Sequence, residues 1–167
     1  MSTLFVDTIN EKTSGNGIKI PGHVVQVQTY LDNSNSAFQT SSGSYVTSAG
    51  NLPSLSITPK YSDSKILIIA HVGMQHDAGG QIENTIFRIV SGQSNVDLSG
   101  GNTYGLCFKG TSEANGFWVQ ANISVSDTPG TTSQVTYTWY ARSESSNNIY
   151  ANHSGSSNAM TLMEIAQ

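Results

Sequence analysis

Charged residues are scarce in this chain, and the basic ones are scattered along it. The 167 residues include 7 Lys and Arg against 11 Asp and Glu, which gives a formal net charge of −4. No two basic residues are adjacent in the sequence. A patch that neutralises several phosphates is therefore not expected, and we predict that the protein does not bind nucleic acid.

Cysteine and long apolar runs are also nearly absent. The single Cys107 excludes an intrachain disulfide. It lies between large apolar residues in the segment 104–108, where we expect a buried and unreactive thiol. The longest aliphatic run, 66–70, is far shorter than the ~20 residues of a membrane span. The first residues lack the basic and apolar regions of a secretory signal, so we expect neither membrane insertion nor secretion by that route.

Helix-forming residues are few, whereas Ser, Thr, Asn and Gly are abundant, a composition that favours β-structure with long polar loops. Helical periodicity is absent, and short segments with the two-residue alternation of strands recur instead. These segments are 25–31, 52–59, 65–74, 84–90, 104–108, 117–125, 135–142 and 160–166. The sequence therefore predicts an all-β chain that folds as an antiparallel β-sandwich of jelly-roll type.

The pattern of apolar residues assigns places to several of these strands. The segment 66–74 is apolar on both faces, which is typical of a central strand. Pro53 and Pro59 confine the strand between them to a sheet edge or to its own ends. In the segment 25–31, the alternation predicts that Val27 and Leu31 point toward the core.

The first 22 residues contain too little apolar surface to fold alone, although they are patterned like extended structure. Their apolar points flank a turn-forming run at residues 13–17. We therefore divide the chain into an extended segment for oligomerisation, residues 1–22, and a β-sandwich head, residues 23–167. The candidate oligomerisation residues are Val6, Ile9, Ile18 and Ile20.

Two aromatic residues are candidates for a ligand site or a subunit interface. Strand alternation leaves Trp118 and Tyr140 on faces otherwise made mostly of Gln, Asn, Ser and Thr. An outward Trp can stack on a sugar ring or anchor a subunit contact. A third interpretation stays open, in which each face packs under a loop of the same chain.

No motif in the sequence indicates catalysis or a bound cofactor. His71, His76 and Asp77 could offer metal ligands, but their spacing matches no established metal-binding motif. The sequence has no Gly-x-Ser-x-Gly nucleophile elbow and no phosphate-binding loop of the Gly-rich type. We therefore expect a protein that is not an enzyme and that has no catalytic residues, metal or cofactor.

Two segments, 6–26 and 56–68, resemble parts of tail-fibre and other virion structural proteins of tailed phages, especially marine ones. The first is similar to their N-terminal segment and the second to the entry into their β-sandwich. The resemblance implies a homotrimer joined near its three-fold axis by the N-terminal segments. It also implies contacts with other virion tail proteins, binding to a host surface component such as a glycan, and synthesis in the host cytoplasm before incorporation into the virion.

Two other functions remain open from the sequence. The chain could be a stand-alone carbohydrate-binding β-sandwich module without a virion role, or a small glycan-cleaving enzyme on the same scaffold. The mass of the assembly in solution separates a fibre protein from a free module. Release of a product from a bound glycan would identify an enzyme.

Overall fold

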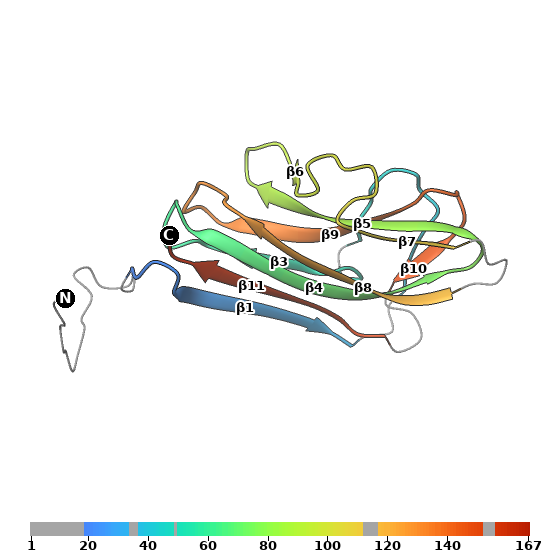
Figure 1. The fold of residues 1–167 in the computed structure, drawn as a ribbon, viewed down its shortest axis with the longest axis horizontal. Coiled ribbons are helices and arrows are strands. Elements are labelled where there is room, and N and C mark those ends of the chain that lie inside the picture. The colour runs from blue at the N-terminus through green and yellow to red at the C-terminus, as the bar shows by residue number, and fades with distance from the viewer. Residues whose placement is uncertain (1–18, 34–36, 49, 112–116, 152–155) are drawn as a thin grey trace, which may run out of the picture.

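The computed structural model describes residues 19–33, 37–48, 50–111, 117–151 and 156–167, and these contain eleven strands and no helix. Figure 1 shows them as an elongated stack of β-structure. The strands are β1 (Val24–Asp32), β2 (Phe38–Thr40), β3 (Ser54–Ile57), β4 (Lys65–His76), β5 (Gly80–Val90), β6 (Val96–Asp97), β7 (Cys107–Thr111), β8 (Phe117–Asp127), β9 (Val135–Ser143), β10 (Ile149–Ala151) and β11 (Asn158–Ile165).

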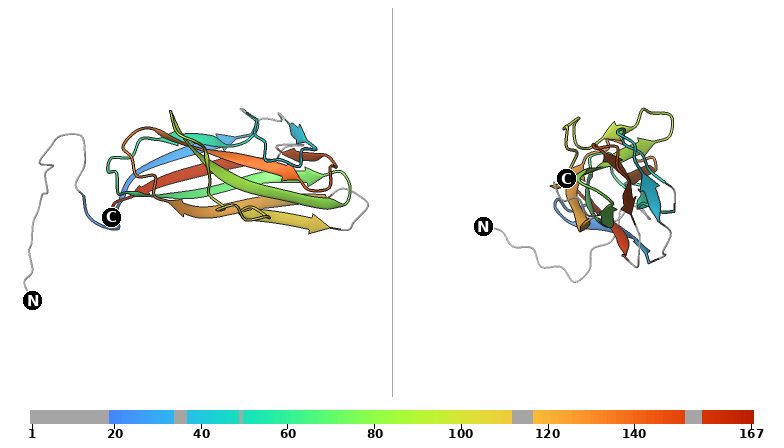
Figure 2. Two further views of the ribbon diagram at one scale, coloured as in Figure 1. Left: turned by 90° about the horizontal axis from the view of Figure 1, so that it is seen from above. Right: turned by 90° about the vertical axis from the view of Figure 1, so that its right-hand side faces the viewer.

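The strands form two sheets in which every pair of named strands is antiparallel. In the first, sheet A, β1, β11, β4 and β8 lie side by side, and the short β10 and β2 continue it beside the far end of β4. In the second, sheet B, β3, β9 and β5 are neighbours, and β6 and β7 both pair with β5. Figure 2 shows the sheets from above and from one end.

The order of the strands defines a jelly roll. Without the short β2, β6 and β10, the chain passes from one sheet to the other at every step except between β5 and β7, which are neighbours in sheet B. The resulting orders, β1-β11-β4-β8 and β3-β9-β5-β7, are those of an eight-stranded double-sheet jelly roll. The predicted all-β sandwich is therefore confirmed.

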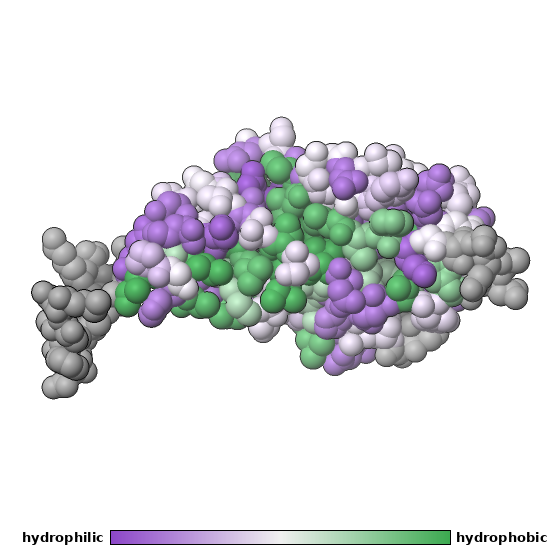
Figure 3. Space-filling model, in the orientation of Figure 1, coloured by the Kyte–Doolittle hydropathy of each residue, from purple (hydrophilic) through white to green (hydrophobic). Residues whose placement is uncertain are grey.

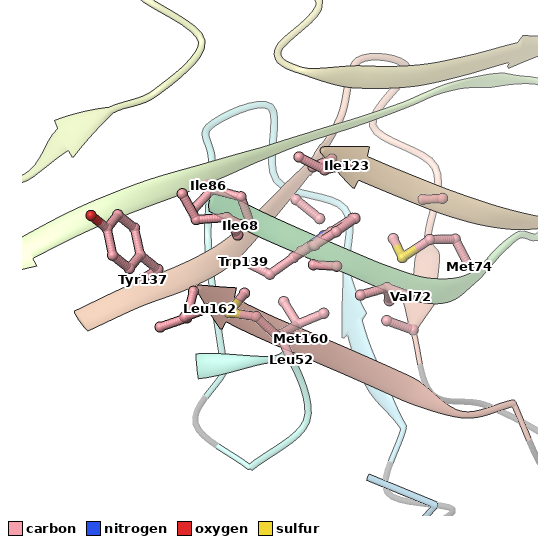
Figure 4. Packing of buried hydrophobic residues seen from close by; sticks show 14 of the residues in the cluster. Leu52, Ile68, Val72, Met74, Ile86, Ile123, Tyr137, Trp139, Met160 and Leu162 are labelled. Carbon is pink, nitrogen blue, oxygen red and sulfur yellow. The ribbon is translucent and has the colours of Figure 1, made fainter. Parts of the chain in front are cut away.

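The core lies between the two sheets and consists of the inward side chains of alternating positions. On β9 the predicted inward residues Val135, Tyr137, Trp139 and Ala141 are all fully buried. Figure 4 shows Trp139 among Ile68, Ile86, Met160 and Leu162. The indole Nε1 of Trp139 donates to Asn84 Oδ1 at 2.9 Å, so the polar atom of this side chain has a partner inside the core.

Two strand placements predicted from the sequence are also confirmed. Strand β4 is central, because it pairs with β11 and β10 on one side and with β8 on the other. Strand β3, between Pro53 and Pro59, is the edge strand of sheet B and pairs only with β9 among the described residues. The fold therefore follows the apolar pattern in its centre and the proline positions at its edge.

The predicted orientation of β1 is wrong. Tyr30 packs against the core, whereas Val27 and Leu31 point outward and are 49% and 65% exposed. The cause is a buried carboxylate on the neighbouring strand: Glu164 of β11 accepts a hydrogen bond of 2.6 Å from Gln26 Nε2. Because side chains alternate along a strand, an inward Gln26 places the odd-numbered residues that follow it on the outer face.

Glu164 also holds the turn that precedes β4. Its Oε1 accepts hydrogen bonds from Ser64 Oγ at 2.7 Å, from the backbone N–H of Lys60 at 2.8 Å and from that of Tyr61 at 3.2 Å. The carboxylate is fully buried, so each donor replaces a hydrogen bond that water would make. This network fixes β11, β1 and the 60–64 turn relative to one another.

Residues 19–23 are attached to the sandwich just before β1 begins. The ammonium group of Lys19 lies 2.6 Å from Asp63 Oδ2, and the backbone N–H of Gly22 donates to the carbonyl of Ala166 at 2.8 Å. The predicted domain boundary after residue 22 stays a prediction, because residues 1–18 lie outside the described part of the chain.

Candidate interaction surface

The outer face of sheet A carries the predicted Trp118. Even-numbered residues of β8 point outward, since Ala121 and Ile123 are buried in the core, and Trp118 is 53% exposed. The register places Trp118 beside Gln75 of β4, and Gln75 beside Tyr150 of β10. We call these residues, together with Gln39 of β2 beside Tyr150, the Trp118 row.

The Trp118 row presents two aromatic rings with amide groups between and beside them. Neighbouring strands are about 4.8 Å apart, so Trp118 and Tyr150, which are separated by one strand, lie about 10 Å apart at their Cα atoms. Near one end, Asp77 Oδ2 accepts from Asn148 Nδ2 at 3.0 Å and from the Tyr150 hydroxyl at 3.4 Å. Aromatic faces that stack on sugar rings, beside amides and a carboxylate that bond hydroxyl groups, suit an oligosaccharide.

Sequence reasoning missed three members of this row: Gln39, Gln75 and Tyr150. Tyr150 lies in a three-residue strand, and the alternation of buried Ile149 and Ala151 around it indicates an outward ring. Nothing in the sequence shows that β10 pairs with the end of β4 and thereby places Tyr150 near Trp118. The row is a product of register, which the apolar pattern does not specify for so short a strand.

The second predicted aromatic, Tyr140, lies on the other sheet and forms no common site with Trp118. It points outward from β9 in sheet B, where its ring centroid is 4.4 Å from that of Phe87. Tyr45 contacts Phe87 edge-on at 6.4 Å and lies under the guanidinium of Arg142, 4.5 Å from its ring centroid. A loop residue therefore covers Phe87, the neighbour of Tyr140, which favours the interpretation in which this face packs under a loop of the same chain.

A buried ion pair accompanies this loop packing on sheet B. Glu83 is 1% exposed and lies 2.6 Å from Arg142, which also donates to the carbonyl of Thr103. Burial raises the pKa of Tyr45 to about 12, although the nearby Arg142 opposes the increase. Glu83 and Arg142 neutralise each other's charge, and Arg142 also donates to a carbonyl of the loop backbone. We therefore assign this cluster a structural role.

His76 is buried at the end of β4 in an environment that keeps it neutral. Its Nδ1 accepts from the N–H of Ala78 at 3.2 Å, its Nε2 lies 3.4 Å from Ser145 Oγ, and its ring stacks on Phe117 at 5.8 Å. Burial lowers the pKa of His76, with the charge of Asp77 opposing that shift. Because Asp77 accepts from Asn148 and Tyr150 instead, these groups do not form a Ser-His-Asp triad.

The residues considered for a metal site are not brought together. His71 and His76 lie on opposite faces of β4, because five positions separate them and side chains alternate along a strand. Across the described ranges, no three His, Cys, Asp or Glu side chains are placed to share an ion. Cys107 is a free thiol, but it is half-buried, so the prediction that it is buried was too strong.

The other half of the outer face of sheet A is mostly apolar, with Thr29 and Thr161 in its middle. The register aligns outward residues of β1, β11 and β4 in rows such as Val27–Met163–Leu67 and Leu31–Ala159–His71. Figure 3 shows a broad apolar band across the middle of the side of the molecule that it presents. We call this surface the β1 patch. It comprises Val24, Val27, Leu31, Leu67, Ile69, Met163 and Ile165.

Of the predicted oligomerisation residues, only Ile20 lies in the described part of the chain. It is 37% exposed and precedes β1. Val6, Ile9 and Ile18 lie outside the described residues, so their role stays a prediction.

A shallow hollow of about 330 Å³ lies at the opposite end of the sandwich from the Trp118 row. It is lined by Ile89, Val90, Ser91, Ser133, Gln134 and Thr136, none of which has an ionisable side chain. The polar groups there are hydroxyls and one amide, which is a poor set for acid–base chemistry.

With the fold described, the chain can be compared with known proteins. No protein-family model matches the sequence, and a search of curated proteins found no match. A structure of infectious bursal disease virus, Gx strain, covers 86% of this chain at 14% identity with a TM-score of 0.39. The Gt strain structure covers 86% of this chain at 11% identity with a TM-score of 0.34. The chain spans 33% of the first of those two proteins and 39% of the second.

None of the described segments is a helix with the length and hydrophobicity of a membrane span.

Proposed function

We propose that this chain is a structural protein of a virus particle, a tail fibre or receptor-binding adaptor that assembles as a homotrimer. In this proposal the sandwich binds a glycan of the host surface and does not cleave it. The N-terminal segment joins copies to one another and to neighbouring tail proteins. The similarity of residues 6–26 and 56–68 to tail-fibre and virion proteins of tailed phages supports the viral role.

The observation that carries the binding function is the Trp118 row. Trp118 is 53% exposed near the start of β8 and lies beside Gln75 of β4, and an exposed indole is a side chain that stacks on sugar rings. A jelly roll is a common scaffold for virus coat and lectin domains, although the scaffold alone does not define a function. The polar neighbours of Trp118 provide the hydrogen-bond donors and acceptors that sugar hydroxyls require.

The experiment is a glycan array with the full chain, Trp118→Ala and Phe108→Ala. Phe108 is also 53% exposed, but it lies on β7 of sheet B, so it is a matched control for loss of an exposed aromatic ring. We expect binding of a defined glycan set by the unaltered chain and by Phe108→Ala. Loss of one stacking contact of about 1–3 kcal/mol should weaken Trp118→Ala binding by roughly 5- to 150-fold.

Four outcomes would change the assignment. Equal binding by both variants would remove Trp118 from the site, and no binding by the unaltered chain would contradict glycan recognition. Release of shorter saccharides from a bound glycan would identify an enzyme. A chain that binds glycan but stays a single copy in solution would favour the stand-alone carbohydrate-binding module, which the same row supports equally well.

A further inference from the structure

Strand β1 has a free edge that few features protect. Within the described part of the chain it pairs with β11 on one side only, and the sole charged residue among its nine is Asp32, at the end. It contains no Pro or Lys, and its one irregularity is a bulge between Val24 and Gln26. Edge strands without such protection are sites where another chain can pair or pack.

The β1 patch beside this edge is apolar to an unusual degree for an outer sheet face. Val24 is 52% exposed, Val27 49%, Leu31 65% and Ile69 44%. The bulge places Val24 opposite Ile165 while Val27 is opposite Met163, so both valines point outward. Two threonines, Thr29 and Thr161, lie beside Ile69 in the middle of the patch, with apolar rows on both sides of them. A largely apolar surface of this kind marks an interaction site rather than a set of scattered exposed residues.

The scarcity of charge on the patch indicates which kind of partner binds there. Along its length the outward ionisable residues of β4 are Lys65 and His71, one at each end, while the whole chain carries a formal charge of −4. Two copies of an acidic chain repel each other least where both are neutral, and apolar surface on one copy matches the same surface on another. A nucleic acid or an anionic lipid surface would require basic residues here instead.

The position of the N-terminal segment points to the same occupant. Residues 19–23 lead directly into β1 at the end of the patch that contains Val24, so the chain that precedes them is connected to the sandwich at this point. A segment that joins copies there would hold a second sandwich close to the patch. Contact between the patches then becomes effectively intramolecular, which strengthens it without new residues.

We propose that the β1 patch is an interface between copies of this chain, formed by the sandwich itself in addition to residues 1–22. The proposal rests on the homotrimer of the proposed function and names a surface that completes it. Burial of Val27, Leu31 and Ile69 against a neighbouring copy explains why these side chains are not polar.

The test uses single cysteines in the full-length Cys107→Ser chain. Leu31→Cys and Ile69→Cys lie in the patch, and Ser124→Cys is the matched control, because Ser124 pairs with Ile69 in the register but belongs to the polar strand β8. We expect a short bismaleimide to cross-link copies through Leu31→Cys. A bulky maleimide should label both patch cysteines at least about tenfold more slowly than Ser124→Cys, as burial in an interface slows access.

A second pair of variants tests the energetics. Ile69→Asp should lower the mass of the assembly at a given concentration, whereas Ser124→Asp should leave it unchanged, with β-structure in both checked by circular dichroism. If Ile69→Asp does not fold, the cysteine labelling decides alone.

Each result separates this inference from the proposed function. A trimer with patch cysteines labelled as fast as Ser124→Cys overturns the patch interface and leaves the trimer intact. A single-copy chain at all concentrations overturns both. Patch protection in a single-copy chain that disappears on deletion of residues 1–18 shows that the chain's own N-terminal segment is the occupant, which also overturns the inference.

Discussion

The side-chain amide of Gln26 donates to the buried carboxylate of Glu164 at 2.6 Å, and this contact determines which face of β1 meets the core. Glu164 needs several donors because it is fully buried. Gln26 of β1 provides one of these donors and therefore points inward, so Val27 and Leu31 point outward. The requirement of one carboxylate thus produces the apolar patch on the outer face of sheet A.

Glu164→Gln should therefore destabilise the sandwich. The amide oxygen can still accept from the 60–64 turn, but the amide N–H then faces Gln26 Nε2, which is itself a donor. The bond to Gln26 is lost, and the remaining donors no longer bind a charged acceptor. We expect a loss of roughly 2–4 kcal/mol in the free energy of unfolding. Urea denaturation measures it, with the exposed Glu144→Gln as control. Equal midpoints for the two variants would contradict the role of the network.

His76 should make the protein less stable in mild acid. Burial lowers the pKa of His76 below its ordinary 6.5, so the unfolded chain binds the proton more readily than the folded one. The stabilisation is complete above about pH 6.5 and is lost as the pH falls toward the folded-state pKa, at up to about 1.4 kcal/mol per pH unit.

Denaturation at several pH values checks this expectation for His76. The loss of stability between pH 7 and pH 5 should be smaller in His76→Gln than in the unaltered chain and unchanged in the surface variant His23→Gln. A His76→Gln variant with the same pH dependence as the unaltered chain would rule out His76 as its source.

Two tyrosine hydroxyls should respond oppositely to removal. Tyr137 OH donates to Asp127 Oδ2 at 2.8 Å, and Arg88 binds the same carboxylate at 2.8 and 3.0 Å. Among the described residues, the buried hydroxyl of Tyr45 has no hydrogen-bond partner. Tyr137→Phe should therefore cost about 1.5–3 kcal/mol, whereas Tyr45→Phe should be neutral or stabilising.

Thermal or urea denaturation of the two Phe variants provides the measurement, because each change removes a single oxygen atom. A larger loss for Tyr45→Phe than for Tyr137→Phe would mean that the hydrogen bonding described around these rings is incorrect.

Two glycines with similar backbone angles should differ in their tolerance of a side chain. Gly105 has φ +68° and Gly92 has φ +78°, but a Cβ at Gly105 would lie 2.4 Å from the carbonyl oxygen of Asn84, whereas the space at Gly92 is open. Both Ala variants incur about 1–2 kcal/mol from the left-handed conformation. Gly105→Ala should lose roughly a further 1–3 kcal/mol. Equal unfolding midpoints would exclude the close approach.

The sequence predicts the sandwich well because alternation and composition are local signals. The inward faces of β8 and β9 and the central place of β4 follow directly from where Ala121, Trp139 and Ile68 occur. These residues are surrounded by neighbours that repeat the same pattern. Agreement between adjacent positions makes such assignments robust.

The orientation of β1 and the Trp118 row could not be predicted, because both depend on partners distant in the sequence. Alternation in β1 is compatible with either face inward, and Glu164, 138 residues from Gln26, makes the choice. Tyr150 joins Trp118 only through the register of β10 with β4. The alternation placed both Tyr140 and Trp118 on outward faces, but Tyr140 packs on Phe87 and is half-buried, whereas Trp118 is 53% exposed.

The most direct test of the account is the mass of the unaltered full chain in solution, measured by light scattering over a wide range of protein concentration. Assembly through the N-terminal segment and the β1 patch predicts the mass of three chains, maintained on dilution into the micromolar range. The mass of a single chain at every concentration would contradict the account.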